Sequence, residues 1–264
     1  MPPRSNAAAS GGTSSTLPAI DLPDDMGVCA CGEASRRAFD NSAPEYDSLV
    51  GQEELFMGLR LLRWWLLGKS EGRVLEVACG TARNIDYFRA APDGATEPSQ
   101  GVTSLTLVDA SQGMLDEARR KARERSTSRG ALAEVRVVKA SAEALPLDDG
   151  EFDTVADTFG LCSMDDPVGA LLEMQRVCKP GGKILLLEHG IGTWEFINGL
   201  LERSAPKHFA KWGCWYNRDV DAIVKASGLR VVSRSRWHFG TTYVYECEPA
   251  SKAELDAIRS RRGG

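Results

Sequence analysis

Several features of common protein classes are missing from this sequence. No apolar run reaches the roughly 18 residues that a membrane-spanning helix needs. Acidic residues number 37 against 32 basic residues, and the net charge is −5. Proteins that bind nucleic acids usually carry an excess of positive charge, so we expect no nucleic-acid partner. The hydrophobic content, 42 % of 264 residues, is enough to build a sizeable core.

Cysteine pairing and metal-binding motifs are also missing. The seven cysteines are odd in number and no secretory signal precedes them, which favours free thiols in a reducing compartment. Cys29 and Cys31 form the only close pair, and no second pair or histidine lies near them in the sequence. The spacing therefore predicts no metal site.

The two common glycine-rich nucleotide fingerprints are absent where they would be expected. Residues 73–84 read R-V-L-E-V-A-C-G-T-A-R-N. This pattern predicts a buried parallel strand, a glycine turn and then a helix over residues 81–90. A dinucleotide site needs glycine at three positions, which here hold Gly80, Ala82 and Ile85. A phosphate-binding loop would need glycine in place of Arg63. Neither kind of site is predicted.

Two acidic residues nevertheless suit a nucleotide-like ligand. Glu76 lies inside the apolar strand, where a carboxylate is costly unless it has a partner, and a ligand's ammonium group could be that partner. Asp109 ends the next predicted strand, residues 105–109, where a carboxylate can accept hydrogen bonds from two ribose hydroxyls. Asp109 could instead cap the following helix, but Ser111 already suits that role.

The rest of the chain continues to alternate between predicted strands and helices. Further strands are expected at residues 135–139, 152–158 and 183–188, helices at 114–125 and 168–177, a turn at 179–182, and a terminal antiparallel hairpin at 229–236 and 241–248. This pattern predicts an α/β protein built as a three-layer sandwich.

The stretch V-L-E-V-A-C-G-T-A-R-N resembles the first motif of class I S-adenosylmethionine (SAM) methyltransferases, and of their UbiE-like subgroup in particular. L-C-S-M-D-D-P at residues 161–167 and G-C-W-Y-N-R-D at 213–219 resemble eukaryotic members, including alkyl-thiol methyltransferases and a fungal mitochondrial inner-membrane group. The resemblance implies a Rossmann-like, mostly parallel seven-stranded sheet with a C-terminal antiparallel hairpin. It also implies SAM as cofactor and a small or lipophilic methyl acceptor of thiol, quinol or phenol type.

Two departures from the family pattern leave a second hypothesis open. Ala82 stands where the family usually has glycine, and its methyl group should narrow the turn and weaken cofactor binding. Ser141 stands where an aspartate is common, and a hydroxyl accepts a hydrogen bond more weakly. A methyltransferase-like assembly or interaction protein, with weak or no catalysis, is therefore the alternative. The sequence Asn-Pro-Pro-aromatic is missing after the fourth strand, which argues against an adenine or glutamine-amide acceptor.

The resemblance carries over a set of expected cofactor residues. Gly80 and its neighbours would hold the amino-acid end of SAM, Glu76 its ammonium group and Asp109 its ribose. The full set of expected cofactor residues comprises Tyr46, Glu76, Gly80, Asp109, Ala110, Ser141, Ala142, Glu143 and Thr158.

The acceptor is expected to bind beyond the fifth strand. His189 ends that strand and could act there as a catalytic base or orient the acceptor, although a structural histidine would fit as well. Residues 191–216 form an aromatic-rich insert, the place where this fold commonly recognises acceptors. The expected acceptor-binding residues are Cys162, Trp194, Trp215 and Tyr216, although the role that fits the cysteine best by itself is that of a small buried hydrophobe.

The expected boundaries follow from composition. Residues 1–40 should be a flexible extension, 41–250 the methyltransferase domain and 251–264 a charged, frayed tail. Residues 54–67 read as one strongly apolar helix that either packs on the sheet or makes a peripheral membrane contact. The first 20 residues hold no acid and weakly resemble a mitochondrial transit peptide. We expect a cytoplasmic or mitochondrial location and not a secreted protein.

Overall fold

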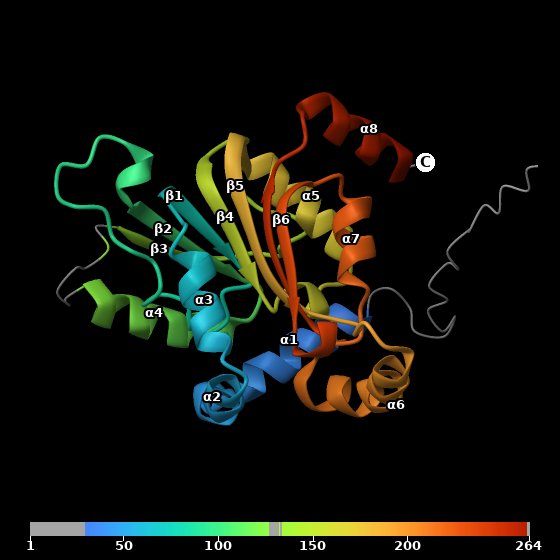
Figure 1. The fold of residues 1–264 in the computed structure, drawn as a ribbon. Coiled ribbons are helices and arrows are strands. Elements are labelled where there is room, and N and C mark those ends of the chain that lie inside the picture. The colour runs from blue at the N-terminus through green and yellow to red at the C-terminus, as the bar shows by residue number, and fades with distance from the viewer. Residues whose placement is uncertain (1–29, 127–131, 133, 263–264) are drawn as a thin grey trace, which may run out of the picture.

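The computed structural model describes residues 30–126, 132 and 134–262, and a seven-stranded sheet runs through its centre (Figure 1). The strand order is β3-β2-β1-β4-β5-β7-β6. The strands are β1 (Gly72–Val77), β2 (Val102–Asp109), β3 (Val135–Lys139), β4 (Phe152–Thr158), β5 (Cys178–His189), β6 (Arg230–Trp237) and β7 (Thr242–Glu248). β7 pairs antiparallel with both β5 and β6, whereas β1 to β5 pair in parallel. The predicted fold class is confirmed.

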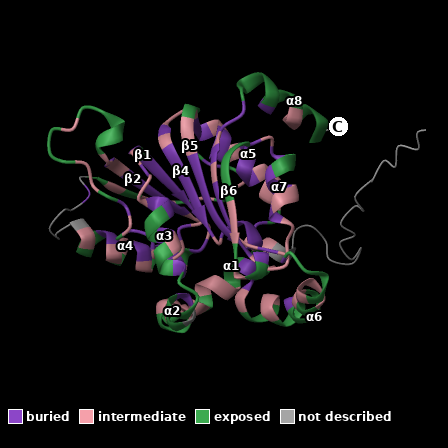
Figure 2. Ribbon diagram, in the orientation of Figure 1, coloured by how far each residue is buried: buried purple, intermediate pink, exposed green. Residues whose placement is uncertain are grey.

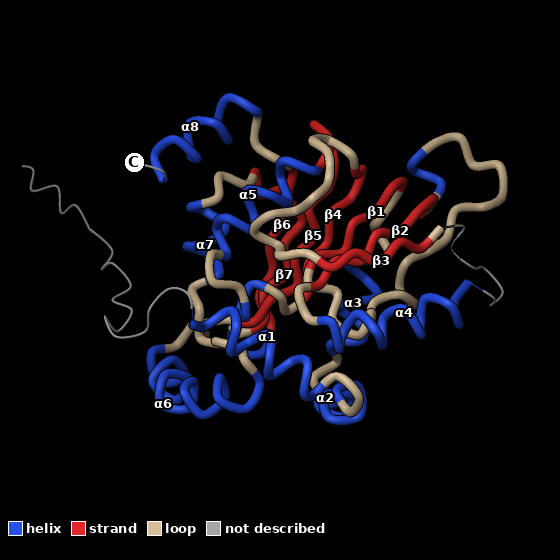
Figure 3. Tube along the Cα trace, turned by 180° about the vertical axis from the view of Figure 1, so that it is seen from behind, coloured by secondary structure: helices blue, strands red, loops and turns tan. Residues whose placement is uncertain are grey.

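Helices cover both faces of the sheet and its carboxyl-terminal end (Figures 1 and 3). α3 (Leu59–Leu67) and α4 (Gln112–Ser126) pack on one face, and α5 (Pro167–Val177) and α7 (Val220–Ala226) pack on the other. α1 (Ala30–Ser42), α2 (Tyr46–Phe56) and α6 (Glu195–Trp212) gather beyond the ends of the parallel strands. Three short 3₁₀ turns are η1 (Pro98–Gln100), η2 (Leu161–Ser163) and η3 (His238–Gly240).

Side chains along a strand alternate between the two faces of the sheet, so one sheet contributes to two hydrophobic cores. Neighbouring side chains of β1 point to opposite faces, so Val74 joins the core under α3 and α4 while Leu75 joins the core under α5 and α7. The central strands are buried along most of their length, whereas α1, α2 and α6 are largely exposed (Figure 2). The sheet is therefore the most deeply buried part of the molecule, and the helices at its carboxyl end are more exposed to solvent.

Two segments that were expected to be flexible are helices in the structure. α1 begins at Ala30, inside the predicted extension, and is held by the Ser35 hydroxyl, which donates to the carbonyl oxygen of Gly213 at 2.7 Å. α8 (Lys252–Arg262) replaces the predicted frayed tail, because Leu255 is buried and Arg262 pairs with Asp166 at 2.6 Å. Their partners lie far away in the sequence, so local composition did not reveal these contacts. Residues 1–29, for which a flexible or transit-like segment was expected, lie outside the described residues.

Three local predictions were also wrong in detail. Residues 81–90 form successive turns and not a helix, in keeping with the left-handed backbone of Ala82 at φ +56°. The predicted helix at 54–67 is divided into α2 and α3 by Gly58, whose φ is +65°. The predicted turn at 179–182 lies inside β5, where Gly181 at φ +76° accompanies a break in the register with β4. In the part of the chain that the structure describes, no helix is long and apolar enough to cross a bilayer.

Candidate active site

A cavity of about 720 Å³ opens at the carboxyl ends of the strands. Its floor is made by the segments that follow β1, β2, β4 and β5, and residues of α1, α2 and α6 close it from the other side. The strand order reverses direction between β1 and β4, and ligands of open α/β sheets bind at such a reversal. The volume also lies in the range of small-molecule sites.

The glycine turn after β1 leaves room for a ligand. Gly80 has φ +54°, and a Cβ atom built there would meet no atom within 4 Å. Its backbone N–H donates to Asp109 Oδ2 at 2.8 Å, and the Ser111 N–H donates to Asp109 Oδ1 at 2.8 Å. Burial raises the pKa of Asp109, and these backbone hydrogen bonds oppose that rise. Each carboxylate oxygen keeps a second lone pair, so the residue is positioned to accept from vicinal hydroxyls.

Glu76 does not line the cavity itself but lies directly behind Asn84, which does. Glu76 Oε1 accepts from Asn84 Nδ2 at 2.7 Å, whereas the buried Oε2 has no hydrogen-bond partner among the described residues. Burial raises the pKa of Glu76 to about 7. An orphaned carboxylate oxygen next to a ligand cavity fits the cationic ammonium group of SAM. The sequence identified this carboxylate, but not the amide that separates it from the cavity.

The other expected cofactor residues all line this cavity. Ser141 Oγ accepts from the backbone N–H of Glu143 at 3.3 Å, and Glu143 Oε1 accepts from the N–H of Asp166 at 2.8 Å. One oxygen of the Glu143 carboxylate is therefore held by the backbone of Asp166, and the Ser141 hydroxyl keeps a proton to donate. The residues from the expected cofactor set that line the cavity are Tyr46, Gly80, Asp109, Ala110, Ser141, Ala142, Glu143 and Thr158.

Ala82 differs from its expected role. Its side chain is fully buried in the core under α3 and α4, and it is not part of the cavity wall. The methyl group therefore does not narrow the space that a cofactor would occupy. The physical consequence of alanine at this position is instead a strained left-handed backbone.

Arg63 is a site residue that sequence reasoning missed. It is 4 % exposed and donates to Asn84 Oδ1 at 2.7 Å, to Thr158 Oγ1 at 2.6 Å and to Glu54 Oε1 at 2.9 Å. These bonds join α3, the glycine turn, β4 and α2 in one buried polar network. The available signal was a charged residue at helical spacing from the apolar residues Leu59 and Leu66 of the same helix.

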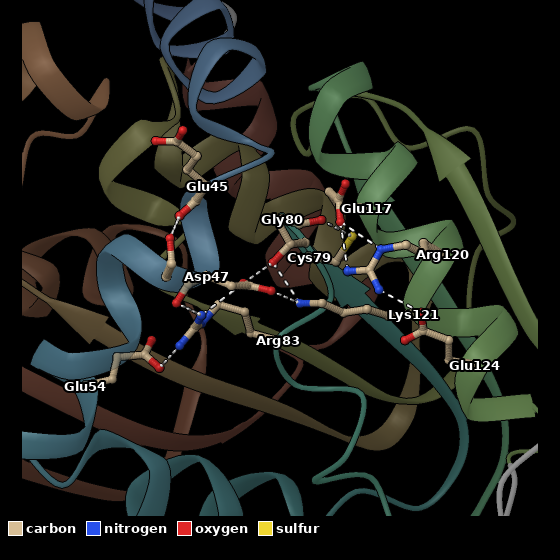
Figure 4. Close-up of polar contacts among 12 residues, drawn as sticks. Glu45, Asp47, Glu54, Cys79, Gly80, Arg83, Glu117, Arg120, Lys121 and Glu124 are labelled. Carbon is tan, nitrogen blue, oxygen red and sulfur yellow. Dashed lines mark hydrogen bonds and ion pairs between the residues drawn. The ribbon is translucent and has the colours of Figure 1, made fainter.

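Asp47 ties α2 to the glycine turn, as Figure 4 shows. It accepts from the Thr81 hydroxyl at 2.7 Å and from Arg83 Nη1 at 2.9 Å, and it forms an ion pair with Lys121 of α4. Arg83 also pairs with Glu54. These interactions hold α2 over the cavity.

The far end of the cavity brings together two thiols, an imidazole and aromatic rings. His189 Nε2 lies 3.2 Å from Cys214 Sγ, and the His189 ring contacts Phe159 and Tyr216 edge-on at centroid distances of 5.2 and 6.3 Å. A hydrogen bond from the Cys214 thiol and the nearby His189 imidazole lower the pKa of Cys162 well below its usual value. Phe159 has φ +59°, a strained conformation that is often found at functional sites.

The aromatic-rich insert at residues 191–216 contributes fewer residues to the cavity wall than expected. Tyr216 lines the cavity together with Leu201, His208 and Trp212, which come from α6. Trp194 does not: it is 62 % exposed and lies against Phe239 on the surface. Trp215 stacks on Phe209 at 4.5 Å and is not part of the cavity wall either. Trp194 precedes α6 and Trp215 follows it, so neither has a helical spacing that would show from the sequence which way its ring points.

The sheet order places a glycine turn and an acidic residue at a strand end beside a cavity that helices cover. This is the arrangement of a class I SAM-dependent methyltransferase. A family model described as a methyltransferase domain matches residues 75–186. A solved SAM-dependent methyltransferase from Thermotoga maritima, 22 % identical, covers 82 % of this chain and 100 % of its own with a TM-score of 0.56. That likeness shows the fold.

Two curated relatives carry the family assignment. The UbiE ubiquinone/menaquinone biosynthesis C-methyltransferase of Shewanella oneidensis is 36 % identical over 200 residues, which are 72 % of this chain and 75 % of the bacterial protein. The mitochondrial methyltransferase OMS1 of Saccharomyces cerevisiae is 35 % identical over 218 residues, which are 78 % of this chain and 44 % of the yeast protein. The chain belongs to the SAM-dependent methyltransferase family that includes UbiE, and its cofactor is SAM. It spans less than half the length of OMS1.

Proposed function

We propose that this protein methylates a small, lipophilic acceptor of thiol, quinol or phenol type. The observation that carries this proposal is that one cavity connects the Gly80–Asp109 turn to an apolar, aromatic end that contains Cys162 and His189. When bound, SAM supplies a methyl group that its sulfonium has already activated. The protein must therefore position the acceptor and exclude water, and it needs little covalent chemistry of its own.

The cofactor end is built to recognise charge and hydroxyl groups. Asp109 would accept from the ribose hydroxyls, and Ser141 borders the adenine. Glu76 would hold the ammonium group, directly or through a water, with Asn84 beside it. Because Arg63 holds Asn84, Thr158 and Glu54 together, it keeps this end preorganised before SAM binds.

The acceptor end is built to enclose an apolar molecule. Tyr216, Trp212 and Leu201 supply its apolar wall, and α6 covers it. His189 lies at the strand end that faces this space, where it would assist loss of the acceptor's proton. A hydroxyl acceptor needs this help more than a thiol does, because a thiol ionises more readily.

We also propose that the acceptor reaches the site from a membrane surface. Large apolar side chains are exposed on α2, on α3, at the start of α6 and on η3: Phe56, Met57, Trp64, Trp194 and Phe239 are 90, 42, 59, 62 and 73 % exposed. They come from segments distant in sequence, which His238 joins by its 2.8 Å hydrogen bond to the Met57 carbonyl oxygen. Met57 also lines the cavity. Tryptophan and phenylalanine favour the interfacial region of a bilayer. The mitochondrial location of the yeast relative suggests a mitochondrial membrane.

Methyl transfer from labelled SAM to a panel of alkyl thiols, quinols and phenols tests the acceptor class. We expect transfer to at least one lipophilic member and none to matched charged analogues. His189→Ala should lower kcat much more than it weakens SAM binding, and Trp215→Phe, outside the cavity, is the matched control. A protein whose melting temperature does not rise on adding SAM would contradict the proposed cofactor site, since binding to the native state must stabilise it.

A further inference from the structure

We infer that Cys162, His189 and Cys214 form a zinc-binding site at the acceptor end of the cavity. We also infer that the open coordination position of this zinc takes the sulfur of a thiol acceptor. The inference rests on the proposed methyl transfer and deepens it, because it names the acceptor class and gives His189 its role through the metal.

The three side chains already have nearly the geometry that zinc requires. The two Sγ atoms and a ring nitrogen of His189 all lie within 4.8 Å of one another, and His189 Nε2 is 3.2 Å from Cys214 Sγ. Zinc–sulfur bonds of about 2.3 Å and zinc–nitrogen bonds of about 2.0–2.1 Å in a tetrahedron place the ligand atoms roughly 3.5–3.8 Å apart. Shifts of about 1 Å or less would therefore complete the coordination.

Backbone contacts hold the ligands in place. The Trp215 N–H donates to the Cys162 carbonyl oxygen at 2.9 Å, which joins the two cysteine-bearing loops directly. The Ser35 hydroxyl of α1 fixes the neighbouring Gly213 carbonyl. His189 is the last residue of β5 and pairs with Thr242 of β7. A metal site needs such support, because ligands on unanchored loops do not keep their spacing.

The ligand set favours a catalytic soft-metal site over a structural one. Thiolates and imidazole select zinc over magnesium or calcium, which prefer oxygen. Structural zinc sites usually have four protein ligands, whereas catalytic sites keep one position open. The described part of the chain brings three ligands to this group. Both cysteines are almost fully buried yet belong to the cavity wall, so the fourth position faces the space for the acceptor.

The open position explains how a thiol acceptor would be activated. A thiol that coordinates zinc loses its S–H proton, which leaves to solvent. The acceptor's thiolate sulfur then forms a bond to the methyl carbon while the bond from that carbon to the sulfonium sulfur breaks. The sulfonium becomes a neutral thioether, so charge and atoms balance without an oxidant or reductant. Zinc thus replaces a free base, and His189 acts as its ligand.

The test measures metal binding and does not depend on turnover. The full chain is reduced, stripped with a chelator and titrated with Zn²⁺ or Co²⁺ alone, with metal content determined by elemental analysis. We expect about one ion per chain, and for cobalt a thiolate charge-transfer band with the visible bands of tetrahedral coordination. Cys162→Ser and Cys214→Ser should each weaken zinc binding by roughly 100-fold or more, because one of three ligands is lost. Cys178→Ser changes a buried cysteine outside the cavity and should bind zinc like the wild type.

The acceptor role is tested on the cobalt-loaded protein. Adding an alkyl thiol should shift the cobalt bands, whereas the corresponding alcohol should not. The inference is overturned if the reduced wild type binds no zinc, if the Cys162 and Cys214 variants bind it as tightly as the wild type, or if the two thiols are found as a disulfide that Zn²⁺ does not prevent. SAM binding is measured by calorimetry on the same samples. SAM binding without zinc binding refutes the metal site alone, whereas zinc binding without SAM binding refutes the proposed methyl transfer.

Discussion

Glu76 gives a prediction in which binding and proton release are coupled. Its pKa is raised to about 7 by burial, while hydrogen bonding from Asn84 and the charge of Arg63 lower it only in part. If Oε2 receives the ammonium group of SAM, directly or through a water, the carboxylate must be ionised in the complex. Below pH 7 the free protein holds a proton on Glu76, so SAM binding must expel that proton.

The size of the effect follows from the pKa. Apparent SAM affinity should fall about tenfold for each pH unit below 7, and about 30-fold between pH 8 and pH 5.5. The number of protons released per SAM bound should be about 0.9 at pH 6 and about 0.1 at pH 8. Asp109, whose pKa is also raised by burial, could add to this dependence, so the comparison with Glu76→Gln is essential.

Titration calorimetry in buffers of different ionisation enthalpy measures the released protons. Glu76→Gln should bind SAM more weakly at pH 8, and its affinity should be nearly independent of pH. If proton release at pH 6 is the same in the wild type and in Glu76→Gln, Glu76 is not the group that meets the ammonium, and the reasoning is refuted.

Stability without SAM provides a second readout of the same pKa. Because the folded-state pKa is about 7 and the unfolded value 4.5, the folded protein binds the proton more tightly. The stabilising contribution of that proton is therefore fully present below pH 4.5 and is lost as pH rises through 7, by about 3 kcal/mol. Glu76→Gln cannot ionise, so its melting temperature relative to the wild type should rise over the same pH range.

Four further predictions concern other parts of the site. Asp109→Ala should keep the fold and lose most SAM binding, since hydrogen bonds to a charged group contribute about 1.5–3 kcal/mol each; unchanged affinity by calorimetry would remove the ribose assignment. Asp47→Ala should release α2 from the glycine turn and speed hydrogen exchange in α2 while leaving the sheet unchanged; equal exchange would show that α2 is held by other contacts. Ala82→Gly should relieve about 1 kcal/mol of left-handed strain with little change in SAM affinity, and a marked fall in affinity would show that the buried methyl shapes the turn. Replacing Phe56 and Trp64 together by serine should reduce sedimentation with anionic lipid vesicles without changing SAM binding; undiminished sedimentation would place the membrane contact elsewhere.

The sheet and its cofactor end were predictable because their signals are local. An apolar run followed by glycine marks β1, alternating elements fix the α/β class, and an acid at the end of β2 marks the position of Asp109. Each feature depends on residues within one strand–turn unit, where periodicity and backbone conformation constrain the choice. The Ser111 helix cap was predicted for the same reason, and its hydroxyl accepts from the Met114 backbone N–H of its own helix.

The acceptor end could not be read from local patterns. Cys162, His189 and Cys214 are separated by 27 and 25 residues (189 − 162 and 214 − 189). The pairing of β4 with β5 brings the first two segments together, and the Trp215 N–H bond to the Cys162 carbonyl oxygen adds the third. Trp194 precedes α6 and Tyr216 follows it, so which of the two rings lines the cavity depends on how α6 packs, which composition does not reveal.

The sequence by itself determined that this chain folds around a parallel sheet with a glycine turn suited to a nucleotide-like ligand, because strand periodicity and glycine turns act over a few residues. That the ligand is SAM followed from the resemblance of this motif to the methyltransferase family. Tertiary structure alone decided that α1 closes the cavity, that Arg63 joins four segments in one polar network, and that two thiols meet an imidazole beside the acceptor space. These are contacts between segments far apart in the chain, and patterns that act over a few residues do not specify them.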